Sequence, residues 1–311
     1  MSDSQVERLI EQIKAKNRRG LAKAITFVEN REEGVPDLMN FAYKNMNDQA
    51  LVIGITGPGG AGKSTTVDKV IKQFRKEGRK VGVIAVDPSS PYTGGAFLGD
   101  RVRMGSHNTD LDVFIRSFGS RGSMGGISQG TKQCLYLFKN YDFDVIIVES
   151  LGIGQDETEI TNFVDVTVVT VVPGYGDSIQ IAKAGMQEIA DIFVVNKADK
   201  PDAEEFYHQM LNSLTMIPEE LRPRMLKTVA TTELGIPELV AAMVEVGQKQ
   251  LAKRPEKSQV RIRAEIETEV FNLVRKKIEN IIKEKAEAVF RGQATPFEIS
   301  DQILSTIQFK Q

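Results

Sequence analysis

The 311-residue sequence contains one cysteine, two histidines and no tryptophan. The single cysteine, Cys134, excludes a disulfide within the chain and suits a reducing compartment such as the cytoplasm. The 42 Asp and Glu residues nearly balance the 40 Lys and Arg residues, so the overall charge does not favour a nucleic acid or an anionic membrane as partner. No apolar run is long enough to cross a bilayer, and the first residues lack the apolar core of a signal peptide. Composition therefore predicts a soluble, cytoplasmic protein.

The strongest motif lies in residues 51–66, which read LVIGITGPGGAGKSTT. An apolar run leads into the P-loop pattern, whose members are Gly57, Pro58, Gly59, Gly60, Ala61, Gly62, Lys63 and Ser64, followed by Thr65. Glycines let the backbone approach phosphate oxygens, and the following helix offers its N-terminal N–H groups to an anion. We expect Lys63 to reach the β- and γ-phosphates and Ser64 to bind Mg²⁺. The motif predicts that the chain binds a nucleoside triphosphate.

Short apolar runs alternate with helical segments from residue 51 to about 252. The runs are 52–56, 81–86, 113–117, 145–148, 166–172, 192–195 and 226–230. This alternation predicts an α/β fold with a parallel sheet, helices on both faces and the ligand at the carboxyl ends of the strands. We expect a P-loop nucleotide-binding domain over residues 47–254, between a helical N-terminal extension over 1–46 and a helical C-terminal arm over 255–311.

The predicted arm consists mainly of one long charged helix over residues 258–290, ended by Gly292 and Pro296 and followed by a short helix over 297–309. Its apolar stripe includes Ile266, Val270 and Leu273 and is narrow for a helix buried in a core. Such a stripe suits either a dimer contact or packing on its own domain.

The second motif is Asn196-Lys197-Ala198-Asp199, which follows the apolar run 192–195. It matches the NKxD pattern with which GTPases recognise guanine. The Asp199 carboxylate can accept hydrogen bonds from the N1–H and 2-amino groups of guanine, whereas adenine offers no such pair of donors. The motif therefore favours GTP over ATP.

Two further strands end in carboxylates, at Asp87 and Glu149. Either acid can hold Mg²⁺ directly or through water, and a helix-capping carboxylate is the alternative for one of them. The loop Gly152-Ile153-Gly154-Gln155 follows Glu149 and suits a segment that senses the γ-phosphate. Gln155 can orient the attacking water, or it is simply a solvated side chain.

Five stretches resemble the MeaB/ArgK family of P-loop GTPases, the G-protein chaperones of cobalamin-dependent acyl-CoA mutases. They read GPGGAGKST at 57–65, VDPSSPYTGGAFLGDRVRM at 86–104, ESLGIGQDE at 149–157, PGYGDSIQ at 173–180 and NKAD at 196–199. The 86–104 stretch is the most specific, because general GTPases lack it. The resemblance extends over nearly the whole chain, including both helical extensions.

The resemblance implies a GTP-hydrolysing protein that uses Mg²⁺, binds no cobalamin itself and forms a homodimer through its arm. It would gate cobalamin loading into an adenosylcobalamin-dependent acyl-CoA mutase, such as methylmalonyl-CoA mutase, and protect or reactivate it. By position, the catalytic residues would be Lys63, Glu149, Gln155 and Asp100, and the metal environment would be Ser64, Asp87, Asp100 and Glu149. Switch segments would contain Arg103, Gly154, Asp177 and Lys183, and the guanine would be flanked by Val229, Ala230 and Thr231.

The chain also departs from the usual family pattern. The differences are Ser150, Leu151, Ile153 and Asp156 in the second switch, Tyr175 and Ile181 in the third, and Val229 in place of a serine beside the base. They concern the identity of the partner mutase rather than the GTPase.

Other functions use related folds. A nickel-insertion GTPase would need soft ligands at close spacing, whereas the His and Cys residues here are only His107, His208 and Cys134, none adjacent in sequence. A small-molecule kinase would transfer phosphate to a substrate instead of water, and the NKAD motif with its paired switch loops favours hydrolysis. A non-catalytic scaffold is disfavoured because the phosphate and metal positions are intact.

Overall fold

The computed structural model describes residues 2–87, 105–107, 109–119, 129–152, 160–174, 186–252 and 254–306. The chain divides into two compact units, Met1–Ala252 and Lys253–Gln311. The strands of the first unit are β1 (Leu51–Thr56), β2 (Val81–Asp87), β3 (Val113–Gly119), β4 (Val145–Glu149), β5 (Val166–Val171), β6 (Ile192–Asn196) and β7 (Arg224–Thr228). Its α-helices are α1 (Ser2–Lys14), α2 (Arg18–Glu29), α3 (Val35–Lys44), α4 (Lys63–Lys76), α6 (Gln129–Lys139), α8 (Met186–Ile189), α9 (Ala203–Ser213) and α10 (Ile236–Ala252). Short 3₁₀ turns are η1 (Gly105–His107), η3 (Leu214–Met216), η4 (Glu219–Leu221) and η5 (Ala230–Thr232).

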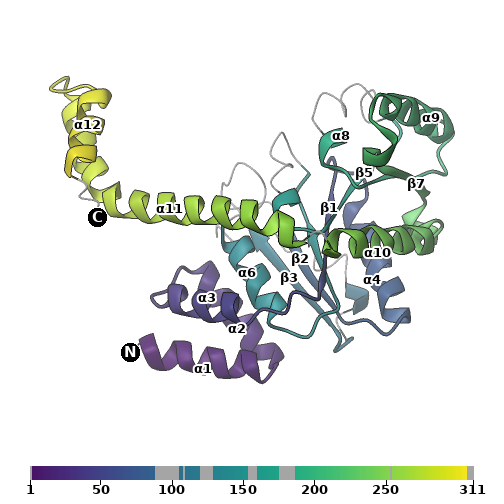
Figure 1. The fold of residues 1–311 in the computed structure, drawn as a ribbon, viewed down its shortest axis with the longest axis horizontal. Coiled ribbons are helices and arrows are strands. Elements are labelled where there is room, and N and C mark those ends of the chain that lie inside the picture. The colour runs from purple at the N-terminus through teal and green to yellow at the C-terminus, as the bar shows by residue number, and fades with distance from the viewer. Residues whose placement is uncertain are drawn as a thin grey trace. The chain divides into compact units, whose positions relative to one another are not determined.

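Within the described part of the chain, seven strands form one sheet in the order β3-β2-β4-β1-β5-β6-β7 (Figure 1). Every neighbouring pair is parallel. Strands β1, β2, β4, β5 and β6 are buried along their whole length, as expected when helices cover both faces. The predicted α/β parallel-sheet fold is confirmed, with the strand that precedes the P-loop at its centre.

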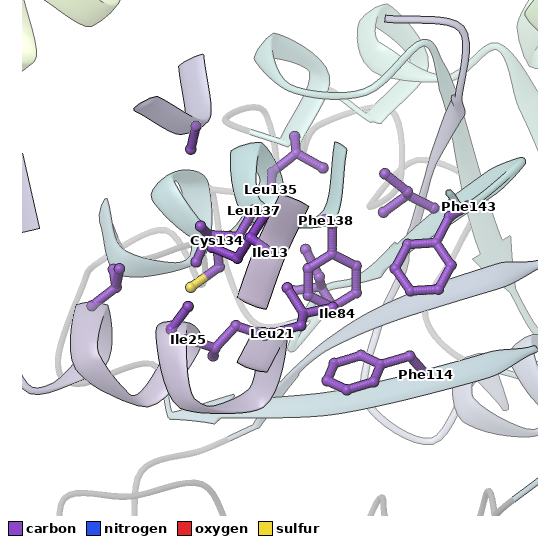
Figure 2. Packing of buried hydrophobic residues seen from close by; sticks show 14 of the residues in the cluster. Ile13, Leu21, Ile25, Ile84, Phe114, Cys134, Leu135, Leu137, Phe138 and Phe143 are labelled. Atoms are coloured by element: carbon purple, nitrogen blue, oxygen red, sulfur yellow. The ribbon is translucent and has the colours of Figure 1, made fainter. Parts of the chain in front are cut away.

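The two faces of the sheet have separate cores. On one face, Val52 and Ile146 pack with apolar residues of α1–α3 and α6. On the other, Ile53 and Ile147 pack with α4 and α10. Figure 2 shows part of the first core, in which residues of the N-terminal helices lie beside those of α6 and of the edge strand β3. The N-terminal helices therefore share a core with the sheet inside one compact unit.

Strand β7 differs from the prediction, because it occupies Arg224–Thr228 instead of 226–230. Its last residue, Thr228, pairs with Asn196 at the end of β6. The chain then leaves the sheet because the Val229 N–H donates to Leu234 O at 3.0 Å and closes a loop around η5. The residues predicted to flank the base thus lie on a loop beyond the sheet edge.

The second unit contains α11 (Arg254–Phe290) and α12 (Pro296–Thr306). Helix α11 starts four residues before the predicted position, at Arg254, and Pro255 suits the first turn of a helix. The stripe residues Ile266, Val270 and Leu273 are 58%, 48% and 58% exposed in the single chain. None of the helices in the described residues is long and apolar enough to cross a membrane.

Candidate functional site

The predicted phosphate loop connects the centre of the sheet to α4. Gly57, Gly60 and Gly62 have φ angles of 133°, 76° and 89°, which other residues adopt only with strain. A β-carbon on Gly57 would overlap the Thr170 carbonyl oxygen, and one on Gly62 would overlap the Asn196 amide. Gly60 instead faces open space. One side of the loop is therefore pressed against β5 and the end of β6, while the other is accessible to a ligand.

Lys63 lies under this loop and is only 8% exposed. Its Nζ donates to the carbonyl oxygens of Gly57 at 2.7 Å, Pro58 at 3.2 Å and Leu151 at 3.3 Å. A β-carbon on Gly152 would overlap both Gly57 O and Lys63 Nζ, so the segment after β4 packs directly on the loop. The ammonium group is thus fixed at the junction of the loop and the second predicted switch.

Ser64, Asp87 and Glu149 provide oxygen atoms at the carboxyl edge of the sheet. The Ser64 hydroxyl donates to Glu149 Oε1 at 2.7 Å. Glu149 ends β4 and Asp87 ends the neighbouring β2, and both side chains are 3% exposed. Two carboxylates and a hydroxyl are hard oxygen ligands of the kind that Mg²⁺ prefers. These donors fit the ion that the P-loop pattern implies.

Asn196 joins the phosphate loop to the end of β7. Its amide group donates to Ala61 O at 2.9 Å, while its Oδ1 accepts from the Thr228 hydroxyl at 3.1 Å and the Ala230 N–H at 3.2 Å. The next residue, Lys197, has φ of 57° and donates from Nζ to Gly60 O at 3.0 Å. Two consecutive residues of the NKAD motif therefore hold the phosphate loop.

A cavity of about 230 Å³ lies beside this junction. It is lined by Gly62, Thr65, Asn196, Lys197, Asp199, Lys200, Val229, Ala230 and Thr231. The structure thus brings together the phosphate loop, the NKAD motif and the predicted base-flanking residues. Two residues of this site were not predicted from the sequence: Lys200, which lines the cavity, and Thr228, which donates a hydrogen bond to Asn196. Each is the immediate sequence neighbour of a predicted site residue.

Six predicted site residues lie outside the described residues. They are Asp100, Arg103, Gly154, Gln155, Asp177 and Lys183. Their assignments to catalysis, metal binding and switching stay predictions.

The three soft-ligand candidates lie on different elements. His107 in η1 is buried, with Nε2 3.2 Å from Asp68 Oδ1, and His208 on α9 is exposed beside Glu204. Cys134 on α6 belongs to the core of Figure 2, where burial raises the pKa of its thiol well above the usual range. Across the described ranges, no three His, Cys, Asp or Glu side chains are grouped so that they could hold a metal ion.

Comparison with known proteins gives a consistent result. The family model described as "Methylmalonyl Co-A mutase-associated GTPase MeaB" matches residues 21–287. A putative GTPase of Pyrococcus horikoshii is 42% identical, over 97% of this chain and 98% of its own length. GTPase ArgK of Escherichia coli is 35% identical, over 85% of this chain and 84% of its own length. The crystal structure of an LAO/AO transport system kinase superposes with a TM-score of 0.69 at 27% identity, covering 99% of each chain. The chain belongs to the MeaB family of GTPases.

Proposed function

We propose that this GTPase is a nucleotide-dependent chaperone of an adenosylcobalamin-dependent acyl-CoA mutase, such as methylmalonyl-CoA mutase. It would gate cobalamin loading and protect or reactivate the mutase, without binding cobalamin itself. The description of its family as mutase-associated supports this proposal. So does the sequence stretch 86–104, which general GTPases lack, together with the stretch 173–180, which resembles the family pattern.

The hydrogen bonds of the Asn196 side chain are the main observation that supports guanine nucleotide binding at this site. Through one side chain, the phosphate loop and the base-flanking loop are held at a defined separation, with Asp199 lining the cavity between them. A guanine in that cavity can donate two hydrogen bonds to the Asp199 carboxylate, whereas an adenine would leave the carboxylate poorly matched.

The hydrolytic roles follow from the charges at the phosphate end. Lys63 would place its positive charge against the β- and γ-phosphates, at the point where negative charge develops in the transition state. Ser64, Asp87 and Glu149, with Asp100, would hold Mg²⁺, which when bound neutralises part of the phosphate charge. Gln155 would orient the attacking water. Because Lys63 Nζ already contacts Leu151 O, a change at the phosphates can reach the second predicted switch directly.

We also propose that the chain forms a homodimer through the arm. The exposed apolar stripe of α11 in the single chain supports this, because such a stripe suits a helix–helix contact. Light scattering of the full chain would show a mass of two chains, and charged substitutions at Ile266 and Leu273 should shift it toward one. The cytoplasmic location stays a prediction from the single cysteine.

The test of the mutase role compares GTP hydrolysis with and without purified methylmalonyl-CoA mutase. Asp177→Ala and Lys183→Ala should retain basal hydrolysis and lose stimulation by the mutase, because neither belongs to the phosphate or guanine motifs. Asp37→Ala, in the exposed first turn of α3, is a matched control that should keep stimulation. Full stimulation in both test variants would remove residues 173–185 from the mechanism.

A kinase function has one specific observation in its favour, because the solved relative is described as a transport system kinase. Measuring GDP and free phosphate in the absence of any small-molecule acceptor separates the two activities. Equal amounts of both products support hydrolysis. GDP formation that needs an added acceptor, without free phosphate, would support the kinase.

A further inference from the structure

A loop at the base end of the candidate site is fixed by an acidic residue that lies outside the nucleotide motifs. Residues 229–235 line the cavity at their start and return through a bridge between Val229 and Leu234. Glu233 follows η5 at the turn of this loop, and its side chain is 31% exposed.

The Glu233 carboxylate contacts two lysines of the P-loop helix. Lys72 donates to Glu233 Oε1, and Lys76 Nζ lies 3.5 Å from Glu233 Oε2. Residues four apart lie on the same face of a helix, so the two ammonium groups converge on one carboxylate. Hydrogen bonding from Lys72 lowers the pKa of Glu233, as expected for a carboxylate that accepts from an ammonium group.

Glu233 adopts a backbone conformation that favours glycine, with φ of 64°. A glycine would take this conformation at lower cost, so local backbone energetics do not explain a glutamate here. The contacts with α4 do supply an explanation, because only a long acidic side chain at this turn can reach both lysines.

The loop therefore has two anchors, one at the end of β6 and one on α4. Asn196 holds it from β6 by accepting from the Ala230 N–H at 3.2 Å. Glu233 holds it from α4, the helix that also presents Thr65 to the cavity and carries Lys63 at its first position. Helix α4 thus connects the phosphate end of the site to the base-flanking loop.

We propose that Glu233 is a positioning residue for guanine, which sets nucleotide affinity by fixing residues 229–231 through Lys72 and Lys76. This inference rests on the proposed nucleotide site. Because base contacts are made equally in the ground and transition states, Glu233 acts on nucleotide affinity and leaves the rate of the hydrolysis step at saturating GTP unchanged.

The test uses the full chain and a fluorescent GDP analogue. In Glu233→Gln, which keeps the shape and removes the charge, GDP should dissociate about threefold to tenfold faster, since partly exposed ion pairs have modest effects. The dissociation constant for GTP should rise by a similar factor, while single-turnover hydrolysis at saturating GTP keeps its rate. Lys72→Gln should likewise speed GDP dissociation. The double variant Lys72→Gln/Glu233→Gln should release GDP little faster than Glu233→Gln alone, because both substitutions break the same Lys72–Glu233 contact. Glu238→Gln, an exposed acid at the start of α10, is the matched control.

Glu233→Gly separates positioning from simple stabilisation. This substitution removes the contact with Lys72 and Lys76, and it also removes the energetic cost of a positive φ at a non-glycine residue. The melting temperature without nucleotide should therefore stay equal or rise, while GDP still dissociates faster. If both Glu233 variants release GDP at the rate of the Glu238→Gln control, the inference is wrong. If the unaltered chain itself fails to bind GDP, the proposed nucleotide site fails instead, so the two failures are distinguishable.

Discussion

In the proposed nucleotide site, the phosphate end is expected to bind mainly through backbone groups, whereas the base end is expected to bind through side chains. Four of the six residues of the loop 57–62 are glycines, and the side chains beside it are those of Lys63, Ser64 and the carboxylates Asp87 and Glu149. The base cavity is instead lined by Asn196, Lys197 and Asp199 at the end of β6.

The difference follows from what each end has to recognise. Every nucleoside triphosphate carries the same phosphates, so backbone N–H groups, a fixed cation and ligands for Mg²⁺ can bind any of them without distinguishing the base. Bases differ in their donors and acceptors, which only side chains can distinguish. Changes at the phosphate end should therefore act mainly on turnover, and changes at the base end mainly on affinity and nucleotide choice.

The largest expected effect is at the phosphate end. Lys63→Ala removes the buried cation, and hydrolysis should fall by about a thousandfold, because charge in the transition state loses its partner. Single-turnover hydrolysis at saturating GTP measures this effect. As a control, Lys80→Ala removes an exposed lysine and should leave the rate of GTP hydrolysis unchanged. A Lys63→Ala variant with near-normal turnover would contradict the assignment of this end.

The next effect is at the base end. Asp199→Asn should weaken GTP binding by about 10- to 100-fold, since one carboxylate no longer accepts two hydrogen bonds from guanine. Binding of xanthosine triphosphate should improve, because the new amide can donate to the 2-oxo group. Competition binding with GTP, xanthosine triphosphate and ATP gives the comparison, with Asp202→Asn as the control. Equal affinity of the unaltered chain for ATP and GTP would contradict the base assignment.

A third, smaller effect tests whether the two ends are independent. Asn196→Asp keeps acceptors for Thr228 and Ala230 but replaces the donor to Ala61 O with a repelling oxygen. Turnover should fall about tenfold, comparable to the loss of one buried hydrogen bond to the loop, although the base-side contacts remain. Asn196→Ala, which also loses those contacts, should in addition raise the KM for GTP. Steady-state kinetics of both variants measure these effects. Normal turnover in Asn196→Asp would show that the phosphate end does not depend on this contact with the base end.

Much of this arrangement could be predicted from local patterns. The P-loop, the carboxylates at Asp87 and Glu149 and the NKAD motif each follow an apolar strand, and the carboxyl ends of parallel strands meet at one edge. The motifs therefore had to converge there. Their roles in catalysis remain predictions, but their placement needed only strand order and direction.

The base-flanking loop could not be predicted in the same way. Val229 and Ala230 extend the apolar run that begins at Leu226, so the sequence suggests a strand where the chain in fact turns away. The turn depends on the Val229–Leu234 bridge and on contacts from Asn196. The contact between Lys72 and Glu233 joins residues 161 positions apart, and a local pattern contains no information about such a pair.

The smallest expected effect concerns a second anchor of α4, which belongs to neither end of the site. Asp68 is buried, accepts from the Ser106 hydroxyl at 2.6 Å and lies 2.9 Å from Lys69 Nζ. Burial raises the pKa of Asp68, but the Ser106 hydrogen bond and Lys69 outweigh it, so the pKa lies below the usual value of 3.8.

A carboxylate with a depressed pKa stabilises the fold above its unfolded-state value and loses this contribution as the pH falls through the folded-state value. Asp68→Asn should therefore lower the free energy of unfolding by about 1 to 2 kcal/mol at pH 7, with the difference shrinking below about pH 4. Urea unfolding of both proteins between pH 3 and pH 7 measures this effect. Asp68 lies outside the two nucleotide-binding ends, so GDP affinity and turnover at pH 7 should change far less than in the Asn196 variants. A stability difference that stays constant down to pH 3 would show that Asp68 acts through packing instead of charge.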